Sequence, residues 1–162
     1  MSAVIGADEL TVLEDEITDE LIEAYVQGVR DARRQLDLDE AFDIDLYDLD
    51  RALNLVIAGK TYLERIRDGS DIEVLTDTEW HRMYNTGVYD AARNSGISGL
   101  MKTWVTMGDE RVRDTHEYID HMTIPFEAYF YTFDGDYARF PGDFQLPQNS
   151  INCRCVMTVS RA

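Results

Sequence analysis

The sequence predicts an α+β protein, in which a helical N-terminal half leads into a small antiparallel-sheet module with short helices. In the first 97 residues, apolar side chains recur every three or four positions, as they do on one face of a helix. From residue 98 onward, β-branched and aromatic residues alternate with polar ones between turns rich in Gly and Pro, which is typical of strands. We therefore divide the chain into a helical acidic region, residues 1–97, and an α+β module, residues 98–162.

The chain is strongly acidic, and the charge is unevenly distributed. Its 162 residues carry a net charge of −17. Residues 1–50 hold 16 acidic side chains and 3 arginines, a net charge of −13, whereas residues 51–162 carry −4. Such an N-terminal half repels nucleic-acid phosphates, so we expect a solvated acidic surface or one that complements a basic partner. No apolar run reaches 18 residues, and the N-terminus has no basic segment followed by an apolar one, so we expect neither a membrane span nor a secretory signal.

Three helices are predicted in the acidic region. The first follows a flexible start over residues 1–10 and begins at Thr11 or Thr18, since Thr11 and Glu14 have capping-box spacing. Its apolar stripe consists of Leu13, Ile17, Leu21, Ala24, Tyr25, Ala32 and Leu36.

The second helix begins near residues 45–48, and Gly59 is expected to bend or break it. The third begins at Thr76, whose spacing from Glu79 again suits a capping box. It ends before Gly96, which suits the left-handed position at a helix end.

Three strands are predicted in the module. They cover Leu100–Met107, Ala128–Phe133 and Ile151–Val159. Asp134-Gly-Asp136 is expected to form a hairpin-like turn, because Asp-Gly readily adopts positive φ.

A dense polar cluster follows the first strand. Gly108 breaks the strand, and Asp109 is placed to cap a short helix over about residues 110–120. Residues three and four apart are neighbours on a helix, so Arg113, His116 and Asp120 would lie near one face with Asp109.

A second polar cluster lies near the C-terminus, at Asn152-Cys-Arg-Cys155. If this segment is extended, its period of two places Cys153 and Cys155 on one face and Asn152 and Arg154 on the other. The two clusters form either one shared site or a structural clasp between distant parts of the chain. The predicted clasp consists of Asp109, Arg113, His116, Asn152, Cys153, Arg154 and Cys155.

These motifs resemble those of a known family. The pattern K-x-W-x-T-x-x-D-x-R-V-R-x-x-H over residues 102–116, P-G-D at 141–143 and I-N-C-R-C at 151–155 are similar to the phage Mu protein F-like family. These are minor head, or head morphogenesis, proteins of tailed phages. The pattern T-E-x-x-x-x-x-N-x-G over residues 78–87 resembles a helix of the same family, and the resemblance extends over residues 76–158.

The resemblance implies a structural, non-enzymatic role. It implies a few copies in the procapsid near the portal, inside the virion head, after assembly in the host cytoplasm. It also implies a part in head morphogenesis, DNA packaging or ejection, with contact to packaged DNA. From the apolar stripe and the acidic charge, we expect the N-terminal helices to associate with the portal protein, other capsid components or further copies of the chain.

A zinc site is one chemical reading of the two clusters. Thiolate and imidazole suit Zn²⁺, so His116, Cys153 and Cys155 could bind it with Asp109, Asp120 or His121 as a fourth ligand. The C-x-C spacing differs from the usual C-x₂₋₄-C of zinc fingers, and a C-x-C disulfide would close a very tight ring. The alternative is a metal-free clasp, in which hydrogen bonds join the helix and the last strand over buried thiols.

A second reading is an enzyme. A nuclease- or transferase-type site could use Cys153 or Cys155 as nucleophile with His116 as base. Asp134 and Asp136 could bind Mg²⁺, but Asp is common in turns for backbone reasons, and their position in a turn is the better explanation.

A third reading is a DNA-binding module. Arg111, Arg113 and Arg154 are the candidates for phosphate contact. By default we expect each to pair within the chain instead, with Glu110, Asp114 and Asp109 respectively.

Overall fold

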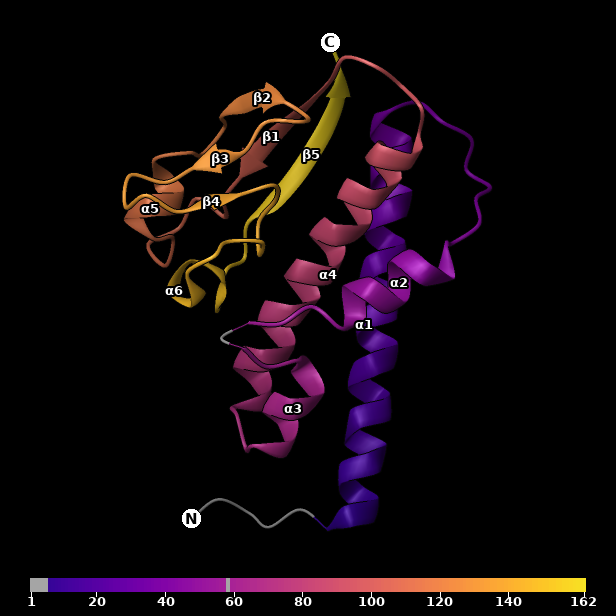
Figure 1. Cartoon of the computed structure of the whole chain (residues 1–162), viewed down its shortest axis with the longest axis vertical. Helices are drawn as coiled ribbons and strands as arrows, with labels where there is room; N and C mark the ends of the chain where they lie inside the picture. The colour runs from indigo at the N-terminus through magenta and orange to yellow at the C-terminus, as the bar shows by residue number, and fades with distance from the viewer. Residues whose placement is uncertain (1–5, 58) are drawn as a thin grey trace.

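The computed structural model describes residues 6–57 and 59–162, and it confirms the α+β class (Figure 1). Four helices come first, and the strands and two single-turn helices follow them. In chain order the elements are α1 (Ala7–Gln35), α2 (Leu46–Leu53), α3 (Tyr62–Arg67), α4 (Ile72–Asn94), β1 (Leu100–Val105), α5 (Asp114–Glu117), β2 (Thr123–Pro125), β3 (Phe130–Tyr131), β4 (Tyr137–Ala138), α6 (Pro147–Ser150) and β5 (Val156–Arg161).

The helical half is built on its two long helices, α1 and α4. They lie side by side and run in the same direction, from the end far from the sheet to the end near it (Figure 1). Most of the stripe predicted for α1 is buried, including Ile17, Leu21 and Ala24. None of the described helices is long and apolar enough to cross a membrane.

The helices approach so closely at two glycines that no side chain would fit. A Cβ atom added to Gly28 would lie 2.0 Å from the carbonyl oxygen of Tyr84. One added to Gly87 would lie 2.2 Å from the carbonyl oxygen of Tyr25. Both distances are far below van der Waals contact, so the packing of α1 on α4 requires glycine at both positions.

The first helix starts earlier than its sequence predicts. It begins at Ala7, where the carboxylate of Glu9 accepts a hydrogen bond from the N–H of Gly6 (3.4 Å). The predicted start at Thr11 or Thr18 is therefore wrong, and the flexible segment predicted over residues 1–10 is wrong for 7–10. Residues 1–5 lie outside the described part of the chain.

The later helices agree with the predictions except at one end. The side chain of Asp45 caps α2, as predicted. The predicted second helix is interrupted near Gly59, and its two parts are α2 and α3. However, α4 begins at Ile72 rather than at Thr76, because the carboxylate of Asp71 accepts the N–H of Val74 (3.1 Å). The helix ends at Asn94, just before Gly96 at φ +73°, as expected.

The sheet is three-stranded and antiparallel, in the order β2-β1-β5, and β3 and β4 form a separate hairpin. The turn between β3 and β4 contains Gly135 at φ +85°, as predicted. The strand β2 was not predicted, and the last strand begins at Val156 rather than at Ile151. The positive φ of Asn152 (+60°) interrupts the extended backbone there.

Candidate functional site

The two polar clusters meet at one buried group of side chains. His116 lies in α5, and Cys153 and Cys155 lie between α6 and β5. Each sulfur lies 3.6 Å from Nδ1 of His116, and the three ligand atoms lie within 4.8 Å of one another. We call these three residues the Cys–His cluster. The structure thus folds the C-terminal segment back onto α5.

The imidazole of His116 is held by aromatic packing. It stacks on Phe144, with ring centroids 5.3 Å apart, and meets Trp104 edge-on at 5.5 Å. Its Nε2 atom is buried and has no hydrogen-bond partner among residues 6–57 and 59–162. The orientation that aims Nδ1 at the sulfurs is therefore set by the shape of the core.

The two thiols have opposite pKa shifts. A hydrogen bond from Cys155 and the neighbouring imidazole lower the pKa of Cys153 well below its usual value. The negative charge that results, together with burial, raises the pKa of Cys155. The two thiols therefore titrate as one coupled pair rather than independently.

The remaining predicted clasp residues form contacts around the cluster. The carboxylate of Asp109 accepts two hydrogen bonds from Arg154 (2.8 and 3.0 Å). The guanidinium of Arg113 donates to the carbonyl oxygen of Ile151. Asn152 contributes its backbone N–H, which donates to Oγ1 of Thr78 (2.7 Å), rather than its exposed side chain.

The predicted fourth metal ligands lie elsewhere. Asp109 does not cap a helix over 110–120, because α5 covers only Asp114–Glu117; its carboxylate instead accepts the N–H of Arg111 (3.0 Å). The carboxylate of Asp120 accepts the N–H of Thr106 (2.9 Å), and the side chain of His121 is 78% exposed. Within the described residues, the Cys–His cluster therefore offers three side chains that could bind a metal ion.

The acidic pair considered for Mg²⁺ is engaged within the fold. The carboxylate of Asp136 accepts the N–H groups of Gln145 and Leu146 (both 3.0 Å). The side-chain amide of Asn149 donates to Asp134 (3.1 Å) and to Asp136 (3.0 Å). These contacts tie the β3–β4 turn to α6.

The motif in α4 joins the helical half to the module, a role that its sequence pattern did not reveal. The amide of Asn85 donates to the carbonyl oxygen of Cys155 (3.0 Å) and accepts the N–H of Met157 (2.8 Å). The carboxylate of Glu79 is fully buried and binds Arg82 and Arg65. Burial lowers the pKa of both arginines to about 10, so they remain charged at neutral pH.

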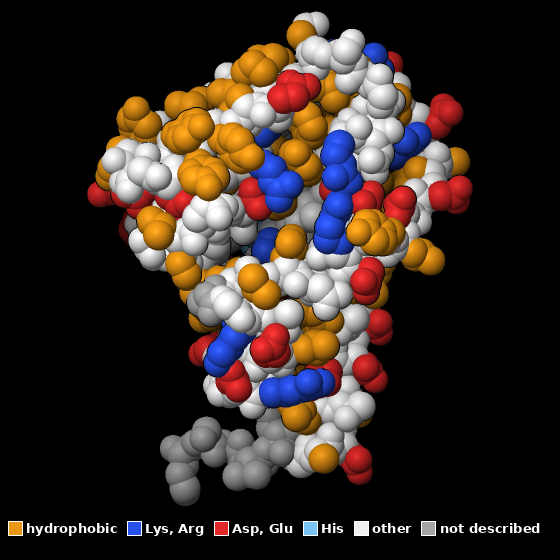
Figure 2. Space-filling model, in the orientation of Figure 1, with side chains coloured by type: hydrophobic (Ala, Val, Ile, Leu, Met, Phe, Trp, Pro, Cys, Tyr) orange, Lys and Arg blue, Asp and Glu red, His pale blue; other side chains and the backbone are white. Residues whose placement is uncertain are grey.

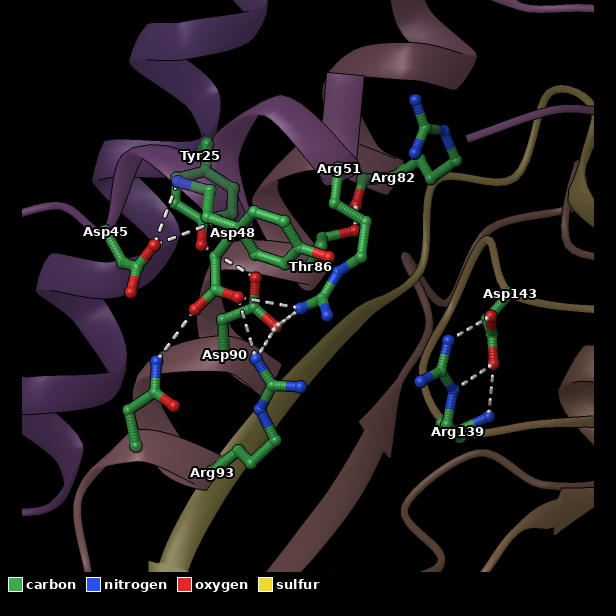
Figure 3. Close-up of polar contacts among 12 residues, drawn as sticks. Tyr25, Asp45, Asp48, Arg51, Arg82, Thr86, Asp90, Arg93, Arg139 and Asp143 are labelled. Carbon is green, nitrogen blue, oxygen red and sulfur yellow. Dashed lines mark hydrogen bonds and ion pairs between the residues drawn. The ribbon is translucent and has the colours of Figure 1, made fainter. Parts of the chain in front are cut away.

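A second polar network, also missed by sequence analysis, links α1, α2 and α4 (Figure 3). The carboxylates of Asp48 and Asp90 share Arg93, with distances of 3.1 and 3.4 Å, and Arg51 binds Asp48 at 2.9 Å. The hydroxyl of Tyr25 donates to Asp90 (2.7 Å), and burial raises the pKa of Asp90. The sequence feature that could have revealed this network is the spacing D-x-x-R, which occurs at both 48–51 and 90–93.

A buried lysine lies on the sheet. Nζ of Lys102 donates to the carbonyl oxygen of Arg139 (2.7 Å) and lies 5.2 Å from the ring centroid of Phe130. Arg139 in turn forms two ionic hydrogen bonds with Asp143 (Figure 3). Desolvation lowers the pKa of Lys102 to about 8.

These features define a class of protein: an acidic pair of parallel helices joined to a small antiparallel module that a buried Cys–His cluster closes. The chain belongs to the phage Mu protein F-like family, whose sequence model matches residues 15–158. It is therefore a phage head morphogenesis protein by family. Neither the curated proteins nor the solved structures gave a match to the chain.

Proposed function

We propose that the chain is a minor head protein that acts as a structural docking part in the procapsid. In this role it binds the portal protein through its helical half and remains inside the virion head after assembly in the host cytoplasm. The surroundings of the candidate catalytic residues also favour a structural role. The carboxylates of Asp134 and Asp136 accept hydrogen bonds from neighbouring segments, and the two thiols are buried.

One observation carries this proposal: an open groove lined by residues of α1 and α4. These residues belong to the end of the helix pair that lies away from the sheet, and Figure 1 shows where that end is. Its volume is about 470 Å³. Its apolar lining consists of Leu13, Ile17, Ile72 and Trp80. Its acidic rim consists of Glu16, Glu20, Glu73 and Asp77.

The groove suits an amphipathic helix with basic flanks. An apolar floor accepts the apolar face of such a helix, and an acidic rim attracts lysines and arginines beside that face. Acidic side chains also follow the outer edge of the helix pair (Figure 2), so the surrounding field favours the same partner. A second copy of this chain would set acid against acid, so we assign the groove to a basic helix of the portal.

Point substitutions test this better than removal of the N-terminal helix. Deletion of residues 1–45 would remove α1, whose apolar face forms part of the core, and loss of binding would then report unfolding. We expect Glu16→Lys/Glu20→Lys/Glu73→Lys to abolish co-purification with the portal protein of the same phage. The helical circular dichroism signal should be retained.

The matched control is Asp15→Lys/Asp19→Lys/Glu23→Lys. It makes the same charge change at exposed positions of α1 outside the groove. We expect this variant to bind the portal almost as wild type does. Equal binding by both triple variants would refute the groove as the docking site, and no binding of wild-type chain to the portal would refute the proposed partner.

A further inference from the structure

We propose that the Cys–His cluster is a zinc site, in which Nδ1 of His116 and the sulfurs of Cys153 and Cys155 bind one Zn²⁺. The site would stabilise the fold by fixing α5 to the segment before β5. This proposal concerns the C-terminal module and is independent of the docking groove.

The first argument is the distance between ligand atoms. In tetrahedral zinc sites, Zn–S bonds are about 2.3 Å and Zn–N bonds are about 2.0–2.1 Å. At a tetrahedral angle, these lengths place sulfur and nitrogen about 3.6 Å apart. Both sulfurs lie 3.6 Å from Nδ1 of His116, so two edges of the tetrahedron are already formed.

The second argument is charge in a buried place. The three side chains are each 1–3% exposed, and a lone ion there would be costly. Two thiolates and one neutral imidazole balance the charge of Zn²⁺, and this donor set is one that the ion prefers. No acidic side chain is needed in the site, in agreement with the position of Asp109 against Arg154.

The third argument is a place for a fourth ligand. A small pocket reaches His116 and Cys155 from the surface, between Met107, Arg113 and Asn152. It offers about 10 Å³ to the centre of a water molecule, which is about the space that one water needs. We assign the fourth position to a water molecule, since three protein ligands leave one corner of the tetrahedron vacant.

The competing account is a pair of S–H···N hydrogen bonds without metal, and the two accounts predict different metal contents. The full-length chain is expressed in zinc-supplemented medium and purified without chelator, and its zinc content is measured by plasma mass spectrometry. We expect one zinc per chain. A strong chelator should lower the melting temperature, and added Zn²⁺ should restore it.

Substitutions locate the site. We expect Cys153→Ser, Cys155→Ser and His116→Asn each to abolish stoichiometric zinc. The matched control is His121→Asn, which removes an exposed imidazole five residues after His116 in the sequence. This variant should retain one zinc per chain.

Cobalt titration of wild-type chain covers the case in which these variants do not fold. Metal-free protein titrated with Co²⁺ should show the intense visible bands of a tetrahedral site and a sulfur-to-cobalt charge-transfer band, saturating at one equivalent. Wild-type chain that holds only a trace of zinc, melts at the same temperature with and without chelator, and shows no such bands would overturn the proposal.

Discussion

The helical half and the α+β module are held together in different ways. In the helical half, the long helices interlock along an apolar stripe and touch backbone to backbone at Gly28 and Gly87. In the module, short elements are joined by polar side chains that reach across the sequence, as from His116 to Cys153. Repetition along the chain therefore specifies the two long helices, whereas single residues specify the module and the ion pairs that join α2 and α3 to α4.

Their surfaces differ as well. The outer edge of the helix pair is acidic, whereas apolar side chains gather over the part of the module around β2 and β3 (Figure 2). Exposed aromatic side chains of this second surface are Tyr129, Tyr131, Phe133 and Tyr137. The acidic edge of the helix pair suits a basic partner. The aromatic surface of the module is the less polar of the two surfaces.

The largest expected effect is at the buried ion group where α3 meets α4. Glu79→Gln would leave the guanidinium groups of Arg65 and Arg82 buried without their carboxylate. Removing one partner of a buried pair costs about 3–5 kcal/mol, so we expect a loss of this size in the free energy of unfolding by urea. The control is Glu14→Gln, which breaks the more exposed pair with Arg67 and should change stability little.

The second prediction concerns the interlock of the helix pair. An exposed Gly→Ala substitution within a helix usually stabilises by up to about 1 kcal/mol. We expect Gly87→Ala to destabilise by about 1–3 kcal/mol or more instead, because its Cβ would meet the carbonyl of Tyr25. Gly6→Ala is the control, since no atom lies within 4 Å of the added Cβ. A stabilised Gly87→Ala variant would contradict the close approach of α1 and α4.

The third prediction concerns the module and its pH dependence. The pKa of Lys102 is about 8 in the fold, below its usual 10.5, so the unfolded chain binds more protons between these values. Stability should therefore rise with pH from about 8 toward 10, by up to about 3 kcal/mol. Lys102→Met should flatten this rise in urea unfolding, whereas Lys60→Met at an exposed site should preserve it.

The upper limit of that pH window is set by two tyrosines. Burial and their bonds to carboxylates raise the pKa of Tyr25 and Tyr84. Above pH 10 these phenols hold protons that the unfolded chain releases, which lowers stability as pH rises. Arg65 and Arg82, whose pKa in the fold is about 10, act in the opposite direction above that pH, so the comparison with Lys102→Met is made between pH 8 and 10. An equal slope in wild type and Lys102→Met below pH 10 would show that the lysine is not the titrating group.

The smallest effect is expected at the surface pair of the clasp. Asp109→Asn removes the ion pair with Arg154 but retains an oxygen to accept the N–H of Arg111. We expect a slight fall in melting temperature that disappears at about 1 M salt, because salt screens exposed charges. Since Arg154 lowers the pKa of Asp109, the contribution is present above the usual Asp pKa and lost as pH falls below it. A fall in melting temperature as large as that caused by Glu79→Gln would contradict this, because it would mean that the exposed Asp109–Arg154 pair is a main source of the stability of the module.

The contrast between the regions also explains what the sequence predicts. The apolar stripe identified α1, and the glycines near residues 59, 96 and 135 identified a break, a helix end and a turn. The predicted start of α4 was wrong because it relied on the capping-box spacing of Thr76 and Glu79. In the structure Glu79 instead pairs with Arg65, a partner that no local sequence pattern reveals. The strand β2 has only three residues, too few for any period to show.

The candidate site was predictable only in part for the same reason. The segment that carries Cys153 and Cys155 was expected to meet His116, and the structure brings them together. The network of Asp48 and Asp90 was missed because each D-x-x-R pair, taken alone, is typical of a solvated helix surface. Only the packing of α2 on α4 makes them one buried group.

The glycine contacts between α1 and α4 have a mechanical consequence. Neither helix can slide or roll on the other without first lifting the backbones apart, so the pair behaves as a single strut. Asn85 fastens this strut to β5. We therefore expect a displacement at the start of the helices to move α1, α4 and the sheet together, with little bending between them.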